Sequence, residues 1–222
     1  MGRDTRESGA WIEAAFTAEI APVEIPGKKG PTVVAVDESP RKDTSMDVLG
    51  KLKPAFPKDA PKDMKPEELT VTAGNAPGLS DGGAALVVTS EAFAKAHGLP
   101  VMARITGYAS GGTEPRDLFF APIFAVQNLM KKAGTTIGDY DLIEANEAFA
   151  AQALADGDGL TWDPARVNVN GGAIALGHPI GSSGARILAT LVYALKARGK
   201  QTGLATLCLG GGNAVALSVE LA

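Results

Sequence analysis

The chain has 222 residues, of which 45% are hydrophobic and 21% charged, and this composition supports a buried core in one large domain or two small ones. Its formal net charge of −4 excludes the basic character of a typical nucleic-acid-binding domain, so we expect no nucleic-acid partner. A single cysteine excludes an internal disulfide, and no apolar run approaches the ~20 residues of a membrane-spanning helix, so we expect a cytoplasmic protein with no membrane partner.

The first third of the chain is predicted to be irregular. Prolines crowd the stretch from Pro22 to Pro77, and proline interrupts regular structure. In chain order we expect a helix over residues 8–20, two extended pieces joined by a turn within 23–36, a helix through 47–49 capped by Asp43 and Thr44, and an exposed lysine-rich segment over 57–68.

From residue 70 onward, predicted strands alternate with predicted helices. The clearest helix covers residues 183–198, where Ile187, Leu191 and Leu195 fall on one face. This alternation predicts an α/β fold, in which helices cover a mixed sheet that ends in an antiparallel strand pair. Further helices are expected over 91–97, over 122–132 with Gly134 as its end, and from about 147. Strands are expected over 102–108, 140–145, 166–170, 204–208 and 214–221, and a strand or buried helical segment over 84–89.

Three short segments of the last third each place a reactive side chain where a strand is expected to meet a turn. Asn146 can orient a water or an oxygen, His178 can move a proton, and Cys208 can act as a nucleophile or as an acid or base. Together these residue types predict acyl chemistry. The segments are Asn146-Glu147-Ala148-Phe149-Ala150, Gly177-His178-Pro179-Ile180-Gly181 and Cys208-Leu209-Gly210-Gly211-Gly212.

Each of these residues also has a purely structural interpretation. An asparagine between a strand and a helix is often an N-cap, a histidine between glycines can be a turn residue, and a buried cysteine usually acts as a small hydrophobic side chain. A functional Cys208 needs a thiolate stabilised by local donors, which a glycine backbone can supply. The second histidine, His97, ends a predicted helix, and we assign it a structural role there.

The three segments, in this order, resemble the C-terminal part of a thiolase, a member of the family that makes and cleaves 3-oxoacyl-CoA thioesters. The likeness runs from about Glu19 onward, and motifs of this length are far more specific than one glycine-rich pattern. The resemblance implies a thiolase-like mixed five-stranded sheet layered with helices, together with an irregular loop domain. Further matching segments are residues 72–75, 79–82, 169–176 and 183–187.

The resemblance implies a catalytic role for four residues. By the family pattern, His178 deprotonates a nucleophilic cysteine and contributes to an oxyanion hole, and Asn146 holds a water that points at the thioester oxygen. Cys208 exchanges the proton of the α-carbon or of the leaving thiol, and the Gly210 N–H helps to bind a second oxyanion. We expect no metal and no permanently bound cofactor, because the family uses coenzyme A and acetyl-CoA as substrates.

The resemblance also implies where coenzyme A binds. Arg41 is expected near the nucleotide end. Pro77 stands where many thiolases have serine, and it offers neither a hydroxyl nor an N–H for that contact with pantetheine. The residues expected along the pantetheine are Phe56, Ala73, Ala148 and Phe149.

Thiolases have two related halves, and the cysteine that becomes acylated lies in the first half. The single cysteine of this chain, Cys208, matches the second, acid/base cysteine. We therefore expect this chain to be the C-terminal portion of an enzyme, with a missing N-terminal half as its partner and a homodimer or homotetramer as the whole protein. The expected domains are residues 1–78 as part of the loop domain, 79–100 as the end of the N-terminal half and 101–222 as the C-terminal domain.

These interpretations lead to two hypotheses. The first is a thiolase of the acetyl-CoA C-acetyltransferase type, which transfers acyl groups between coenzyme A thioesters by Claisen condensation or thiolysis in fatty acid metabolism, with this chain alone inactive. A degradative 3-ketoacyl-CoA thiolase is a close variant that the motifs do not separate from it. The alternative is a non-catalytic acyl-CoA-binding half, as one member of a split pair or as a truncated product.

Overall fold

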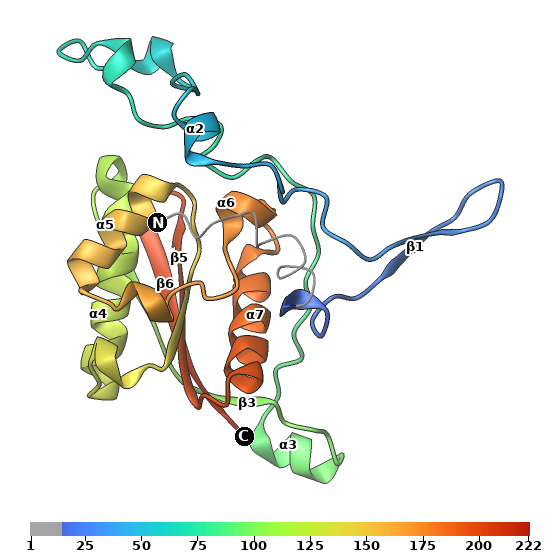
Figure 1. Cartoon of the computed structure of the whole chain (residues 1–222). Helices are drawn as coiled ribbons and strands as arrows, with labels where there is room; N and C mark the ends of the chain where they lie inside the picture. The colour runs from blue at the N-terminus through green and yellow to red at the C-terminus, as the bar shows by residue number, and fades with distance from the viewer. Residues whose placement is uncertain (1–14) are drawn as a thin grey trace.

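The computed structural model describes residues 15–222, and their main body is a four-stranded sheet with helices on both faces (Figure 1). The strands lie in the order β3-β6-β5-β4, with β6 antiparallel to both of its neighbours and β5 parallel to β4. The predicted α/β class, with a mixed sheet that ends in an antiparallel pair, is confirmed. The strands span Ala103–Gly112 (β3), Leu142–Ala145 (β4), Thr202–Leu209 (β5) and Asn213–Leu221 (β6).

Among residues 15–222, the main sheet has four strands rather than the five expected. Residues 166–170, predicted as a strand, pair with β4 only through a parallel bridge between Val167 and Ile143. Asn168 has a left-handed backbone with φ of 45°, and its side-chain amide binds both the N–H and the C=O of Ala145, each at 2.8 Å. A side-chain amide has therefore replaced the backbone pairing that a fifth strand would make.

Helices cover both faces of this sheet. Figure 1 shows α4 and α5 on one face and α7 on the other, with the short helix α6 preceding α7. No helix in the described part of the chain is long and apolar enough to cross a membrane. The bounds are Ala121–Ala133 (α4), Ala150–Leu160 (α5), Ala173–Leu176 (α6) and Ser183–Ala197 (α7), with 3-10 turns at Pro115–Phe120 (η3), Ile137–Asp139 (η4) and Pro164–Arg166 (η5).

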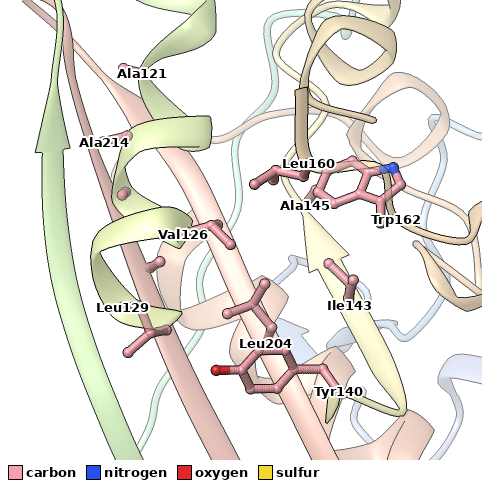
Figure 2. Close-up of a cluster of buried hydrophobic side chains, with 12 residues drawn as sticks. Ala121, Val126, Leu129, Tyr140, Ile143, Ala145, Leu160, Trp162, Leu204 and Ala214 are labelled. Carbon is pink, nitrogen blue, oxygen red and sulfur yellow. The ribbon is translucent and has the colours of Figure 1, made fainter. Parts of the chain in front are cut away.

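Two clusters of buried side chains hold these layers together. The first lies between α4 and the sheet, where Val126 and Leu129 pack toward Leu204 (Figure 2). The second includes Leu191 and Leu195, which join α7 to the opposite face. All five side chains are fully buried, and complete burial of such a side chain stabilises the fold by roughly 1.5–3 kcal/mol. The two cores fix the sheet between its helices and so position the strand ends.

The boundaries of two helices follow from single residues. α4 ends as predicted at Gly134, which adopts a left-handed conformation with φ of 68°. α5 begins at Ala150 rather than near Glu147, because Phe149 is still extended with φ of −152°. The residues between β4 and α5 are therefore a short irregular connection, and this connection carries part of the candidate site.

The first third of the described chain extends away from the main body (Figure 1). Strands β1 and β2 pair antiparallel, which confirms the two extended pieces expected over 23–36, and residues 57–68 are almost wholly exposed, as predicted. The elements are Val23–Ile25 (β1), Thr32–Val34 (β2), Met46–Leu49 (α2), Pro57–Asp59 (η1), Pro66–Glu68 (η2) and Glu91–Ala96 (α3).

Two predictions in this region were wrong. The cap of α2 is Ser45, whose Oγ accepts from the Val48 N–H at 3.3 Å, because only the residue just before the first turn reaches that donor. Residues 84–89 form neither a strand nor a buried helix, and Val87 is 90% exposed. Without burial of its apolar side chains, a short segment has little to stabilise regular structure.

Two further predictions concern helix ends. Of the helix expected over 8–20, residues 15 and 16 are helical, whereas residues 8–14 lie outside the described part. α3 ends at His97, whose ring lies 4.2 Å from the ring of Phe93, and this packing agrees with a structural role for that histidine.

Candidate active site

Asn146 and Cys208 lie at the same edge of the sheet, on neighbouring strand ends. Asn146 directly follows β4, and its N–H donates to the carbonyl oxygen of Thr206 on β5 at 2.9 Å. Cys208 lies two residues further along β5, beside Ala214 of β6. Because β4 and β5 are parallel, their carboxyl ends lie at the same edge. The sheet thus brings together two residues that are 62 positions apart in the sequence.

His178 joins Asn146 from the loop between α6 and α7. The Nε2 of His178 lies 3.3 Å from the Nδ2 of Asn146, which is 1% exposed. The loop depends on Gly177, whose φ of 96° is readily adopted only by glycine. A Cβ at this position would also collide with the side chain of Ser80. Residues 79–82 therefore pack against the loop that carries His178.

The hydrogen bonds of His178 specify its tautomer. Its Nδ1 lies 2.6 Å from the Oγ of Ser183, and this hydroxyl donates to the carbonyl oxygen of Pro179 at 3.0 Å. A serine hydroxyl has a single proton, so while that proton points to Pro179 the Oγ of Ser183 accepts from Nδ1–H. The second ring nitrogen, Nε2, then carries the lone pair that accepts from Asn146.

The surroundings of His178 keep its ring neutral. Burial lowers the pKa of the imidazole, and the positive charge of Arg186 lowers it further. A ring with a lowered pKa is unprotonated near neutral pH. The arrangement therefore presents a neutral imidazole whose Nε2 can take a proton from a reacting group.

The environment of Cys208 favours the thiol over the thiolate. The side chain is half-buried, and burial raises the pKa of the thiol, with a further rise from the nearby charge of Asp156. The resting state therefore differs from the donor-stabilised thiolate expected from the sequence. A thiol in this position can give its proton to a leaving group before it acts as a base.

Asp156 connects Cys208 to the segment that follows Asn146. It is fully buried on α5 and accepts a hydrogen bond from the Nε2 of Gln152, whose Oε1 accepts from the Ala148 N–H at 3.0 Å. Burial raises the pKa of the Asp156 carboxyl to about 7. We did not single out this network from the sequence, although two polar residues at i and i+4 of a helix were a usable signal.

Glu147 braces the two loops that carry Asn146 and His178. One carboxylate oxygen accepts from the Ile174 N–H at 3.1 Å, at the start of the segment that leads to His178. The other accepts from the Nδ2 of Asn168 at 3.2 Å. These bonds hold the turn after β4 against α6, so Glu147 acts as an anchor rather than as a base.

Gly210 lies in the glycine turn between β5 and β6, two residues after Cys208. Gly211 and Gly212 have φ values of 75° and 85°, which residues with a side chain rarely adopt. The carbonyl oxygen of Gly210 accepts from the Nδ2 of Asn213 at 3.3 Å. The turn therefore holds Gly210 at the same edge of the sheet as Cys208, and its oxyanion role stays a prediction.

Two of the residues expected to bind coenzyme A lie at the ends of a short antiparallel contact. The Ala55 N–H donates to the carbonyl oxygen of Val71 at 2.8 Å, with Phe56 and Ala73 just beyond this contact. Phe56 is 52% exposed, so its ring is available for a ligand. Arg41 is also exposed, on the connection that leads to α2.

The turn of residues 72–75 is tied to the start of α5. The carbonyl oxygen of Asn75 accepts from the Ala150 N–H at 2.9 Å. This bond brings Ala73 toward Ala148 and Phe149, and the Phe149 ring packs edge-on against another phenylalanine at 5.0 Å between centroids. Backbone hydrogen bonds thus connect the three segments that carry four of the five residues expected at coenzyme A, whereas their contact with a ligand stays a prediction.

Comparison with known proteins matches both parts of the chain to one family. The profile described as "Thiolase, C-terminal domain" matches residues 99–221, and "Thiolase, N-terminal domain" matches residues 4–92. The acetyl-CoA acetyltransferase of Escherichia coli (strain K12) is 52% identical over 216 residues, which are 97% of this chain and 52% of that protein. The acetyl-CoA acetyltransferase of Pseudomonas aeruginosa is 53% identical over 205 residues, or 92% of this chain and 50% of that protein.

Solved structures give the same result. The Bacillus anthracis acetyl-CoA acetyltransferase superposes with a TM-score of 0.86 and 41% identity, over 98% of this chain and 55% of that one. Human mitochondrial 3-ketoacyl-CoA thiolase in complex with CoA superposes with a TM-score of 0.82 and 39% identity, over 98% of this chain and 53% of that one. The chain spans about half the length of the relatives it matches. On these matches, the chain belongs to the thiolase family.

Proposed function

We propose that this chain carries the acid/base part of the active site of an acetyl-CoA C-acetyltransferase, which transfers acyl groups between coenzyme A thioesters. The observation that carries the proposal is the hydrogen bond between Asn146 and His178 at the end of β4, at the same edge of the sheet as Cys208 on the adjacent parallel strand. Relatives named as acetyl-CoA acetyltransferases support the reaction, and a similar thiolase with bound CoA supports the substrate class.

The first half-reaction uses His178 as the base. Its Nε2 takes the proton of a nucleophilic cysteine, whose thiolate attacks the carbonyl carbon of an acyl-CoA. The carbon–sulfur bond to coenzyme A breaks, and the departing coenzyme A thiolate takes the proton of Cys208. The raised pKa of the Cys208 thiol suits this step, because the proton is still present when it is needed.

The second half-reaction uses the Cys208 thiolate that the first one leaves. This thiolate removes an α-proton of a second acetyl-CoA, and the enolate carbon attacks the acyl-cysteine carbonyl. A carbon–carbon bond forms, and the cysteine leaves as a thiolate that recovers its proton from His178. The Nδ2 of Asn146 has two hydrogens, so one faces His178 and the other can hold a water at the enolate oxygen, a donor typically worth about 3 kcal/mol of barrier.

The acylated cysteine lies outside these residues in this proposal. The 222 residues contain one cysteine, and Cys208 occupies the acid/base position of the family pattern. The proposed partner is an N-terminal half that supplies the nucleophile, within a cytoplasmic homodimer or homotetramer of fatty acid metabolism. This chain by itself is then inactive.

Intact-mass measurement after incubation with acetyl-CoA tests the proposal. We expect no acetyl adduct on this chain, and one adduct on a chimera in which the part of the Escherichia coli relative that this chain does not cover is joined upstream. A chimera that folds and binds coenzyme A but never becomes acetylated would favour the alternative, a non-catalytic acyl-CoA-binding half.

A further inference from the structure

A half-buried arginine contacts the Asn146 side chain of the candidate active site. Arg186 is one turn into α7, and its Nη2 donates to the Oδ1 of Asn146 at 3.4 Å. On the other side of the same amide, the Nδ2 of Asn146 lies 3.3 Å from the Nε2 of His178. Neither the sequence pattern nor the proposed mechanism assigns Arg186 a role.

The strand geometry explains how Asn146 comes to face this helix. Leu142 of β4 packs in the cluster of α7, whereas Ile143 packs in the cluster of α4. Side chains two positions apart on a strand share a face, so Glu144 and then Asn146 point to the α7 side. Arg186 lies on that helix and acts electrostatically on Glu144 as well.

The chemistry of the two groups allows one arrangement. A guanidinium has only donors, so it must face the oxygen of the amide rather than its NH2 group. The NH2 group then faces His178, and because it has no acceptor, the Nε2 of His178 must be the ring nitrogen without a proton. The Ser183 hydroxyl favours the same tautomer from the other side of the ring, because it donates to the Pro179 carbonyl oxygen.

We propose that Arg186 is a positioning residue, which fixes the orientation of the Asn146 amide and thereby keeps the proton of the neutral His178 ring on Nδ1. The consequence for catalysis rests on the proposed function, in which Nε2 is the base. A lysine is a poor substitute for Arg186. Its side chain is shorter, and its ammonium lacks the planar, forked set of donors of a guanidinium.

The hydrogen bonding of Arg186 points to a role at Asn146 in addition to its electrostatic interaction with the carboxyls of Glu144 and Glu19. Its Nε and Nη1 are buried and have no hydrogen-bond partner among the described residues. An arginine with buried, unsatisfied nitrogens is a costly way to stabilise a fold, and apolar side chains of similar size often serve better. The directional contact that this side chain does make is the one with Asn146.

Nuclear magnetic resonance of the whole 222-residue chain tests this inference, because the chain has only two histidines. The 15N shifts of imidazole report which ring nitrogen carries the proton, and a His97→Gln variant identifies the signals of His178. We expect the Nδ1–H tautomer in the unmodified chain near neutral pH. In Arg186→Met the amide is free to turn, and the ratio of Nδ1–H to Nε2–H should fall roughly tenfold, as for loss of one charge-assisted hydrogen bond.

A double-mutant cycle with Asn146→Ala shows whether Arg186 acts through the amide. We expect Arg186→Met to have no further effect on the tautomer once Asn146 is alanine. Arg198→Met is the matched control. Arg198 is the C-cap residue of the same helix and also acts electrostatically on Glu144, but its Nη2 donates to the Val169 carbonyl oxygen. This control should leave the ratio unchanged.

Two results would overturn the inference: an unchanged ratio in Arg186→Met, or effects of Arg186→Met and Asn146→Ala that add. If Arg186→Met alone does not fold, as judged by circular dichroism, the Arg186→Met/Glu144→Gln variant, which also removes the buried carboxyl that interacts with Arg186, takes its place with the same expected ratio. The tautomer measurement does not require acyl transfer. Its result can therefore be interpreted even if the proposed function is wrong.

Discussion

The amide nitrogen Nδ2 of Asn146 lies 3.3 Å from the Nε2 of His178, although the two residues are 32 positions apart in the chain. The contact requires the end of β4, the loop before α7 and the brace from Glu147 to be in place together. It turns two residues with ordinary structural interpretations into a polar pair beside Cys208.

Acidification should destabilise the protein through His178. Burial and Arg186 lower the pKa of this ring below its ordinary value of 6.5, so just below that pH the unfolded chain binds a proton that the folded chain does not. Stability therefore rises with pH in this range and levels off above 6.5. Urea unfolding across this pH range should show that the free energy of unfolding falls more steeply with acidification in the unmodified chain than in His178→Asn. Parallel curves for the two proteins would contradict the prediction.

Glu144 should have the opposite dependence on pH. Burial raises the pKa of its carboxyl from 4.5 to about 8, although Arg186 opposes the rise, so between these values the folded chain holds a proton that the unfolded chain has released. Stability then falls as pH rises through this window, by on the order of a few kcal/mol. Glu144→Gln should remove this part of the fall, whereas Glu24→Gln on the exposed strand β1 should keep it. Equal slopes in all three proteins would rule out the buried carboxyl as the cause.

The single thiol should react slowly, and Asp156 should be part of the reason. Burial and the charge of Asp156 raise the pKa of Cys208, which lowers the fraction of reactive thiolate. Removing the charge in Asp156→Asn should speed alkylation by iodoacetamide roughly two- to fivefold at mildly alkaline pH. The rate is read from intact mass, because one cysteine gives one product. An unchanged rate in a folded variant would show that burial alone controls this thiol.

The core between α7 and the sheet should be sensitive to truncation. Leu191 is fully buried, and Leu191→Ala removes contacts and leaves a cavity, so we expect a loss of about 2–5 kcal/mol in the free energy of unfolding. Leu154 on α5 is 48% exposed, and Leu154→Ala serves as the matched control with a much smaller loss. Denaturant titrations compare the two variants. Similar losses would mean that the α7 cluster is not the packed core described here.

The sequence predicted the parts of the fold that local patterns determine. Gly134 ends α4 as expected, and the glycines after Cys208 do join two antiparallel strands. The prediction of a fifth strand was wrong because Asn168 binds β4 through its side-chain amide. The alternation of apolar residues in the sequence does not reveal such a contact. The prediction for residues 84–89 was wrong because a run of apolar residues does not specify which part of the fold, if any, buries it.

The same distinction applies to the candidate site. Asn146, His178 and Cys208 stood out because their residue types and glycine-rich surroundings are local properties of the sequence. Arg186 and Asp156 did not, because each acts across the fold on a residue far away in the chain. Long-range hydrogen bonds and burial depend on tertiary packing, and one sequence does not specify them by spacing alone.

Thiolysis of acetoacetyl-CoA by the chimera with the upstream part of the Escherichia coli relative is the most direct measurement of the central claim. We predict turnover by the chimera, none by this chain alone, and a loss of at least about a hundredfold in kcat for Cys208→Ala or His178→Ala. Turnover by this chain alone with an acetyl group on Cys208, or full activity of the chimera without that thiol, would contradict the account.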